Sequence, residues 1–437
     1  MTGASLLLAT LAVLVLLLVL IVRAKLHPFV SLLISTLALG LISGMSSQSI
    51  LTSLQKGMAD LLGSIALIIG AGAVLGRMIE VSGGGEALAR ALIRLLGVDN
   101  VSWALLIAAY LVGIPVFFDV GFFTLIPLAW SVSKETKKSL LLYALPLLSA
   151  LTATHALIPT HPGPAAVARL LGADIGKMTL YGLVLAIPMT IVGGITYAGW
   201  IGRRITVAPP EHLLAQGAVN LLRRQPTVLL VLSVILLPIL LIGLGAVFPG
   251  IAWIAFLGSV PVSLLISAVV AMFALGRYSG LAADEILRHT GESLNSVGAL
   301  IMIVGASGAL KQIIVDSGAG AFFGQLMLRV PLSPLLIAFL VGAALRIALG
   351  SATAAIVTAG GIVAPIATAF PAVDAALMAI AVTMGGSIFS HVNDAGFWMV
   401  KEYCGMDVKQ TIQAYSVMKA VTSVSGLFTL WLLSLLV

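Results

Sequence analysis

The feature that most constrains this chain is a succession of long apolar runs, such as residues 6–22 and 29–45, separated by short polar stretches. Of its 437 residues, 60% are hydrophobic and only 9% are charged, whereas soluble domains carry about 25% charged residues. Too few charges remain to cover an exterior that faces water, so most of the surface must face lipid. At about 20 residues per span, the chain has room for roughly ten to fourteen membrane segments.

The basic residues and the single cysteine exclude other classes of protein. The net charge is +7, but the Lys and Arg residues occur in small groups between the apolar runs. This pattern is typical of cytoplasmic loops in membrane proteins rather than of a surface that binds nucleic acid. Cys404 has no second cysteine to pair with, so an internal disulfide framework and a Cys-rich metal site are both excluded.

Placing the basic groups in the cytoplasm predicts one path through the membrane, with both termini in the periplasm. Residues 103–115 and 116–133 are interpreted as two spans, or as one span with a re-entrant hairpin. The polar stretch 205–225 is interpreted as a linker between two halves, which gives a first half (1–204), a cytoplasmic linker (205–226) and a second half (227–437). The other predicted segments are 6–22, 29–45, 60–78, an amphipathic surface stretch at 86–96, 140–158 and 178–200.

An internal repeat supports this division. Residues 63–85 match residues 298–320 at nine of 23 positions, and nearly the same offset pairs His161 with His391. The charge pattern predicts opposite directions for the two matching helices. Matching helices of opposite direction define inverted repeats, which are common in secondary transporters. The alternative is that one glycine-rich apolar helix simply resembles another.

Each half contains two interruptions in its apolar runs, and paired interruptions are where inverted-repeat transporters hold their substrates. Three prolines and a glycine follow one another closely in residues 159–164, which breaks any helix there. The predicted interruptions are 113–121 and 155–164 in the first half, and 342–353 and 385–396 in the second.

Two charged residues lie within these apolar surroundings. A carboxylate such as Asp119 at membrane depth costs about 2.5 to 3.5 kcal/mol on insertion scales, so it requires a partner or a function. Asp119 is interpreted as a site residue, with a helix cap at a hairpin tip as the alternative. Arg346 either binds an anion directly or neutralises Asp119 or Asp394.

Small polar and titratable residues occupy the other interruptions. Ser351 and Thr353 follow a glycine, where a re-entrant tip would offer hydroxyls and backbone N–H groups to an anion. Histidine exchanges protons near neutral pH, and a desolvated aspartate can do so too. His391, Asn393 and Asp394 therefore combine hydrogen-bonding groups with titratable ones.

The runs 113–121 (GIPVFFDVG), 161–164 (HPGP), 346–353 (RIALGSAT) and 390–398 (SHVNDAGFW) resemble those of the bacterial gluconate permease family. The resemblance covers nearly the whole chain. It implies a proton symporter for gluconate or a related sugar acid in the bacterial inner membrane. It also implies a homodimer with re-entrant hairpins, discontinuous helices and elevator-like motion, as in the wider ion-transporter superfamily. Relatives with nearly the same motifs handle hexuronates, glycerate or D-serine.

We therefore expect an all-α membrane carrier rather than an enzyme, without a cofactor and with H⁺ as the coupling ion. The predicted proton-coupling residues are Asp119, His161, His391 and Asp394. The predicted substrate-binding residues are Asp119, Gly121, Thr160, His161, Gly163, Arg346, Ser351, Thr353, His391 and Asn393.

Two rival functions remain at this point. A sodium-coupled carboxylate carrier is one, because unwound carbonyls with Ser, Thr and Asn side chains also suit Na⁺. The other is an intramembrane metallohydrolase that would use His155, His161, His391 and Asp394, although the chain lacks His-Glu-x-x-His spacing.

Overall fold

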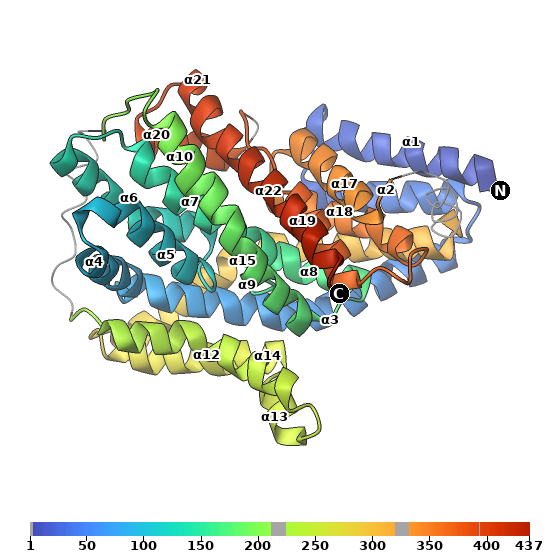
Figure 1. Cartoon of the computed structure of the whole chain (residues 1–437). Coiled ribbons are helices and arrows are strands. Elements are labelled where there is room, and N and C mark those ends of the chain that lie inside the picture. Colours follow the sequence, from blue (N-terminus) through green and yellow to red (C-terminus); the bar gives the residue numbers. More distant parts are fainter. Residues whose placement is uncertain (1–2, 211–223, 320–331, 393) are drawn as a thin grey trace.

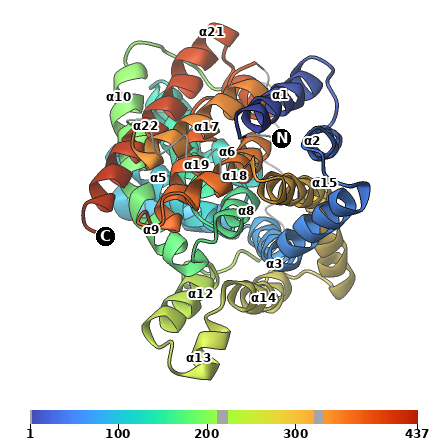
Figure 2. The same cartoon turned by 90° about the vertical axis from the view of Figure 1, so that its right-hand side faces the viewer.

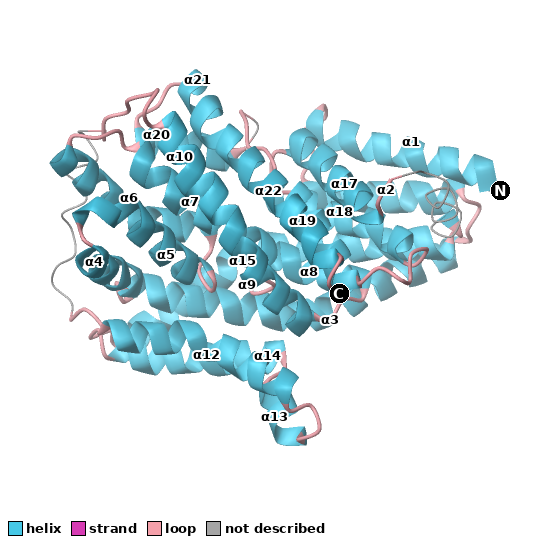
Figure 3. Ribbon diagram, viewed as in Figure 1, coloured by secondary structure: helices cyan, strands magenta, loops and turns pink. Residues whose placement is uncertain are grey.

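A computed structural model of the chain describes residues 3–210, 224–319, 332–392 and 394–437 (Figure 1). Within these ranges the regular elements are helices, and no strand occurs (Figure 3). Seven of the described helices are long and apolar enough to cross a membrane, and six further apolar helices are shorter. The prediction of an all-α polytopic membrane protein is confirmed.

The helices of the first half follow the apolar runs closely, with one exception. The third helix begins at Ser47 rather than at residue 60, and the Ser46 hydroxyl caps it by accepting a hydrogen bond from the Ser49 N–H at 3.1 Å. The helices are α1 (Gly3–Val22), α2 (Pro28–Ile42), α3 (Ser47–Val81), α4 (Gly84–Leu96), α5 (Val101–Gly113), α6 (Phe118–Thr136), α7 (Leu141–Leu157), α8 (Pro162–Leu171), α9 (Ile175–Thr190) and α10 (Tyr197–Ile201).

The second half begins after the predicted linker, of which residues 211–223 lie outside the described ranges. The helices are α12 (Val228–Val247), α13 (Ala252–Leu257), α14 (Val260–Ala271), α15 (Ala283–Asp316), α17 (Pro334–Leu349), α18 (Ala352–Ala367), α19 (Ala375–Gly385), α20 (Ala395–Cys404), α21 (Val408–Thr411) and α22 (Val417–Ser434). Helices α12 and α14 form a hairpin at the edge of the molecule that packs along α3 through α14, and only α13 projects outward (Figures 1 and 2).

The two longest helices, α3 and α15, pack side by side in opposite directions. Near the start of α3, the Ser53 hydroxyl donates to Asp316 at the end of α15 over 2.6 Å. Near the end of α3, Arg77 pairs at 2.8 Å with Glu292 in the early part of α15. An antiparallel pair is what inverted repeats would require of these helices. The repeat itself stays a prediction.

The same order of elements follows α3 and α15. In the first half a tip joins α5 to α6, and a break separates α7 from α8. In the second half a tip joins α17 to α18, and a break separates α19 from α20. Local sequence sets these points: Pro162 stands at the first helical position of α8, where its missing N–H costs nothing. Gly350 ends α17 with a positive φ of 75°, which L-residues with a side chain avoid.

Candidate functional site

Arg346, in the last turn of α17, is the centre of the polar cluster in the second half. Its side chain is 1% exposed and forms an ion pair through Nη2 with the Asp394 carboxylate. The Nε and Nη1 atoms are buried and have no hydrogen-bond partner in the described part of the chain. Both of the roles considered for Arg346 are therefore compatible: it neutralises Asp394 and retains unused donors.

The break between α19 and α20 is held by side chains rather than by helix hydrogen bonds. The Ser390 hydroxyl donates to Asp394, and Asp394 caps α20 by accepting from the Gly396 N–H at 3.1 Å. His391 is half-buried, and its Nε2 donates to the Ile347 carbonyl at 3.0 Å. These bonds tie the break to the end of α17. Asn393, a predicted site residue, lies outside the described residues.

Lys419 is a member of this cluster that the motif analysis missed. It is 6% exposed on α22, with its ammonium 5.9 Å from the ring centre of Phe118 and 5.6 Å from that of Tyr415. A π-helical turn, η4 (Ile412–Ser416), directly precedes α22, and such turns often occur at functional sites. The sequence contains a signal for this residue, because Lys419 is a cation at the start of the last long apolar helix.

The tip between α5 and α6 brings Asp119 to the same place. Asp119 lies in the first turn of α6 and is exposed. Its charge interacts with those of Asp394 and Lys419, and Lys419 interacts with Arg346 as well. The structure thus joins residues from α6, α17, α20 and α22 in one charged cluster. Its two carboxylates come from different halves of the chain, whereas both of its cations, Arg346 and Lys419, come from the second half.

The break between α7 and α8 has a different character. His161 is fully buried, and its Nε2 donates to the Gly113 carbonyl at 2.8 Å, while the Thr160 hydroxyl donates to the Ile114 carbonyl. The rings of His155 and His161 lie 4.7 Å apart, and the Nδ1 atoms of both have no partner among the described residues. These contacts fasten the break to the end of α5.

Four other predicted site residues have packing or capping contacts. A methyl group at Gly121 would approach Leu151 to 2.7 Å, and one at Gly163 would approach Ile356 to 3.2 Å, so both glycines allow close packing. Ser351 caps α18 by accepting from the Ala354 N–H at 3.3 Å. Thr353 lies in the first turn of α18. The described contacts do not join any of the four to Arg346.

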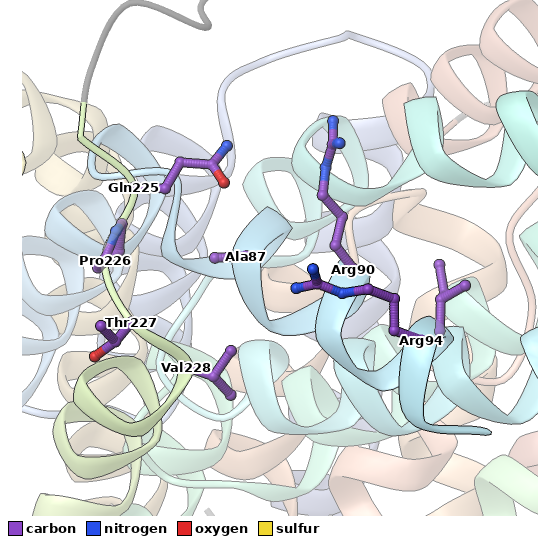
Figure 4. A pocket seen from close by; sticks show the side chains of 8 residues that line it. Ala87, Arg90, Arg94, Gln225, Pro226, Thr227 and Val228 are labelled. Carbon is purple, nitrogen blue, oxygen red and sulfur yellow. The ribbon is translucent and has the colours of Figure 1, made fainter. Parts of the chain in front are cut away.

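Five cavities in the described part of the structure are lined by residues other than Arg346. A cavity of about 210 Å³ borders the first tip at Phe117 and is lined on its other side by Arg77 and Glu292. Figure 4 shows a separate pocket of about 530 Å³, where Arg90 and Arg94 of α4 face residues 225–228. In the described residues no group of three or more His, Cys, Asp or Glu side chains is arranged to hold a metal ion.

Comparisons with known proteins agree with this architecture. The chain is 41% identical to a gluconate permease of Pseudomonas aeruginosa, over 99% of this chain and 98% of the relative. It is 37% identical to a high-affinity gluconate transporter of Escherichia coli, over 97% of this chain and 98% of the relative. The crystal structure of the YdaH transporter of Alcanivorax borkumensis has the same fold, with a TM-score of 0.70 at 14% identity, covering 93% of this chain and 98% of that one.

The family comparison covers almost the whole sequence. Residues 5–436 match the model described as GntP family permease. This match confirms the resemblance that the motifs indicated, and it places the protein among multi-pass membrane transporters rather than enzymes. The chain belongs to the GntP family of permeases.

Proposed function

We propose that this permease imports gluconate, or a closely related sugar acid, together with protons by alternating access. The names of the two relatives support the substrate class. The observation that carries the proposal is the buried Arg346 guanidinium, which holds Asp394 through one nitrogen and leaves Nε and Nη1 without acceptors in the described structure. Buried donors require acceptors, and a sugar acid supplies a carboxylate and several hydroxyls.

The contacts of the predicted polar residues narrow their roles. Thr160 already donates its proton to the Ile114 carbonyl, so its hydroxyl is left to accept a hydrogen bond from a substrate hydroxyl. Ser351 is engaged as a cap but stays exposed at the second tip. A substrate that reached Thr160 and Ser351 as well as Arg346 would meet donors and acceptors from both halves of the chain.

Asp119 is the proposed proton carrier among the four candidates. Asp394 is engaged by Arg346 and Ser390, and the two histidines each donate to a backbone carbonyl. Asp119 is exposed and makes no hydrogen bond within the described residues. A carboxylate that makes no hydrogen bond can load a proton without breaking an existing contact.

We propose that elevator-like motion would carry the first tip and the first break along α3, which belongs to the same half of the chain. A methyl group at Gly72 would lie 2.9 Å from the Thr160 carbonyl, and one at Gly76 would lie 2.8 Å from the Pro115 carbonyl. Side chains are therefore absent from α3 where the first break and the first tip lie against it. Because no side chains of α3 interlock there, the tip and the break can slide along α3 instead of being held in one position.

Uptake into proteoliposomes tests the proposed function. With purified protein, an inward proton gradient should drive accumulation of labelled gluconate, and replacing Na⁺ with choline at fixed pH should leave the rate unchanged. The Asp119→Asn and His161→Ala variants should lose proton-driven accumulation. Full proton-driven uptake by both variants, inserted correctly, would show that the site is misassigned, and dependence on Na⁺ would favour the sodium-coupled rival.

A further inference from the structure

Lys419 is a buried cation for which the described residues provide no hydrogen bond and no ion pair. Its ammonium instead lies between the rings of Phe118 and Tyr415. A buried ammonium without a direct counter-ion is costly, and cation–π contacts offset only about 0.5 to 2 kcal/mol of that cost. This arrangement indicates that the Lys419 ammonium is available to bind an anion transiently.

The charges around Lys419 balance one another. Arg346 and Asp394 form a bonded pair, which leaves Asp119 on α6 and Lys419 on α22 as the remaining opposite charges. The charge of Lys419 also acts on His155 of α7. The phenol of Tyr415, one turn before Lys419, completes the titratable groups around the ammonium. With Asp119 ionised, the cluster carries no net charge.

We propose that Lys419 is a substrate-binding residue whose counter-ion changes during transport, an inference that rests on the proposed function. In the empty carrier the charge of Lys419 is balanced by ionised Asp119. When the substrate enters, its carboxylate replaces Asp119 as the counter-ion of Lys419. The Asp119 carboxylate then binds a proton from the solution. On the other side of the membrane the proton and the anion leave, and Asp119 balances Lys419 again.

Charge balance explains why the two events are coupled. A monovalent anion adds one negative charge to a neutral cluster, and the proton on Asp119 removes it. The empty and loaded clusters are both neutral, so neither state carries an unbalanced charge through the low-dielectric interior. The mechanism requires one proton for each monovalent anion and makes uptake respond to a pH gradient but not to membrane potential.

The test measures gluconate binding and proton uptake together on the full-length purified protein. Gluconate is added to weakly buffered protein in detergent, the bound ligand is quantified from the rise in apparent melting temperature, and the pH change reports protons taken up. The Lys419→Met variant should bind gluconate about tenfold to a hundredfold more weakly, because a charge-assisted contact is lost. Lys409→Met, which removes an exposed lysine from α21, should bind as the wild type does.

Asp119→Asn gives the complementary result. It should bind gluconate at least as tightly as the wild type, because nothing competes for Lys419, but without the uptake of a proton. If Lys419→Met does not fold, the double variant Asp119→Asn with Lys419→Met restores a neutral cluster and should fold while binding weakly. Lys419→Arg should keep binding close to that of the wild type.

The outcomes separate the two proposals. If the wild type does not bind gluconate, the proposed function fails and the role of Lys419 fails with it. If the wild type binds gluconate and Lys419→Met, or the double variant, binds it equally well, the proposed function stands and only the role of Lys419 is wrong. Proton uptake by Asp119→Asn, or uptake that follows an imposed membrane potential, would overturn the exchange of counter-ions.

Discussion

The two broken helices interrupt the membrane interior in similar places along the chain but use different chemistry. At the α7–α8 break, His161 and Thr160 donate to backbone carbonyls at the end of α5, and no charged group takes part in these contacts. At the α19–α20 break, Ser390 and Arg346 converge on the Asp394 carboxylate. The first break is fastened by neutral hydrogen bonds alone, whereas the second has an ion pair in addition to the neutral bond from His391 to the Ile347 carbonyl.

This difference indicates that the two breaks have different roles. Neutral hydrogen bonds to carbonyls fix the backbone conformation at low electrostatic cost. The first break is therefore suited to a structural role. An ion pair with unused guanidinium donors is costly unless it is fully satisfied, so the second break is suited to binding. The first half still contributes to the charged cluster through Asp119, which reaches the cluster from the tip rather than from the break.

The largest expected effect comes from the ion pair of the second break. Arg346→Met should lower the free energy of unfolding by about 3 to 5 kcal/mol, because it deprives the largely buried Asp394 carboxylate of its direct ion-pair partner. The double variant Arg346→Met with Asp394→Leu should recover most of that stability, since both charges are gone, yet should not bind gluconate. Thermal unfolding and ligand-induced melting shifts measure the two effects. Gluconate binding by the double variant would show that Arg346 is not part of the binding site.

A smaller effect should distinguish the two histidines. His161→Asn should destabilise the protein by about 1 to 3 kcal/mol, because a fully buried ring loses its hydrogen bond and leaves the Gly113 carbonyl without a donor. His391→Asn should cost less, because His391 is only half-buried. Unfolding of the two variants under matched conditions checks the order. Equal losses would mean that the first break is not the more rigid support.

The smallest effect concerns the second tip. Ser351→Ala should lower stability by about 1 kcal/mol through loss of the α18 cap, and the neutral Ser351→Asn should restore the cap. If Ser351 only caps the helix, gluconate affinity should be the same in the wild type and in both variants. Weaker gluconate binding by Ser351→Ala would instead show that the hydroxyl contacts the substrate.

Part of the site was predictable because charge inside an apolar run is conspicuous. Asp119, Arg346 and Asp394 were singled out on that ground, and the structure brings them together. The same criterion also selects Lys419. The motifs, however, lie at the interruptions, whereas Lys419 lies in a regular helix. The glycines 121 and 163 were assigned to binding from their place in the motifs, whereas their described contacts are with Leu151 and Ile356.

The ends of the helices were predictable where local chemistry sets them and not elsewhere. Pro162 and Gly350 mark a helix start and a helix end from the covalent structure of the residues themselves. The early start of α3 depends on a polar segment that is helical because it lies against α15, as the contact of Ser53 with Asp316 shows. Hydropathy carries no signal for such a segment.

The sequence by itself determined that this chain resides in lipid, that its helices are interrupted at four points, and that charge is confined to a few positions within them. These properties follow from transfer free energies and backbone geometry, which act residue by residue. Only the tertiary structure decided which charges meet. Asp119 and Lys419 are 300 positions apart in the chain, and their proximity depends on how α6 and α22 pack, which no local pattern records.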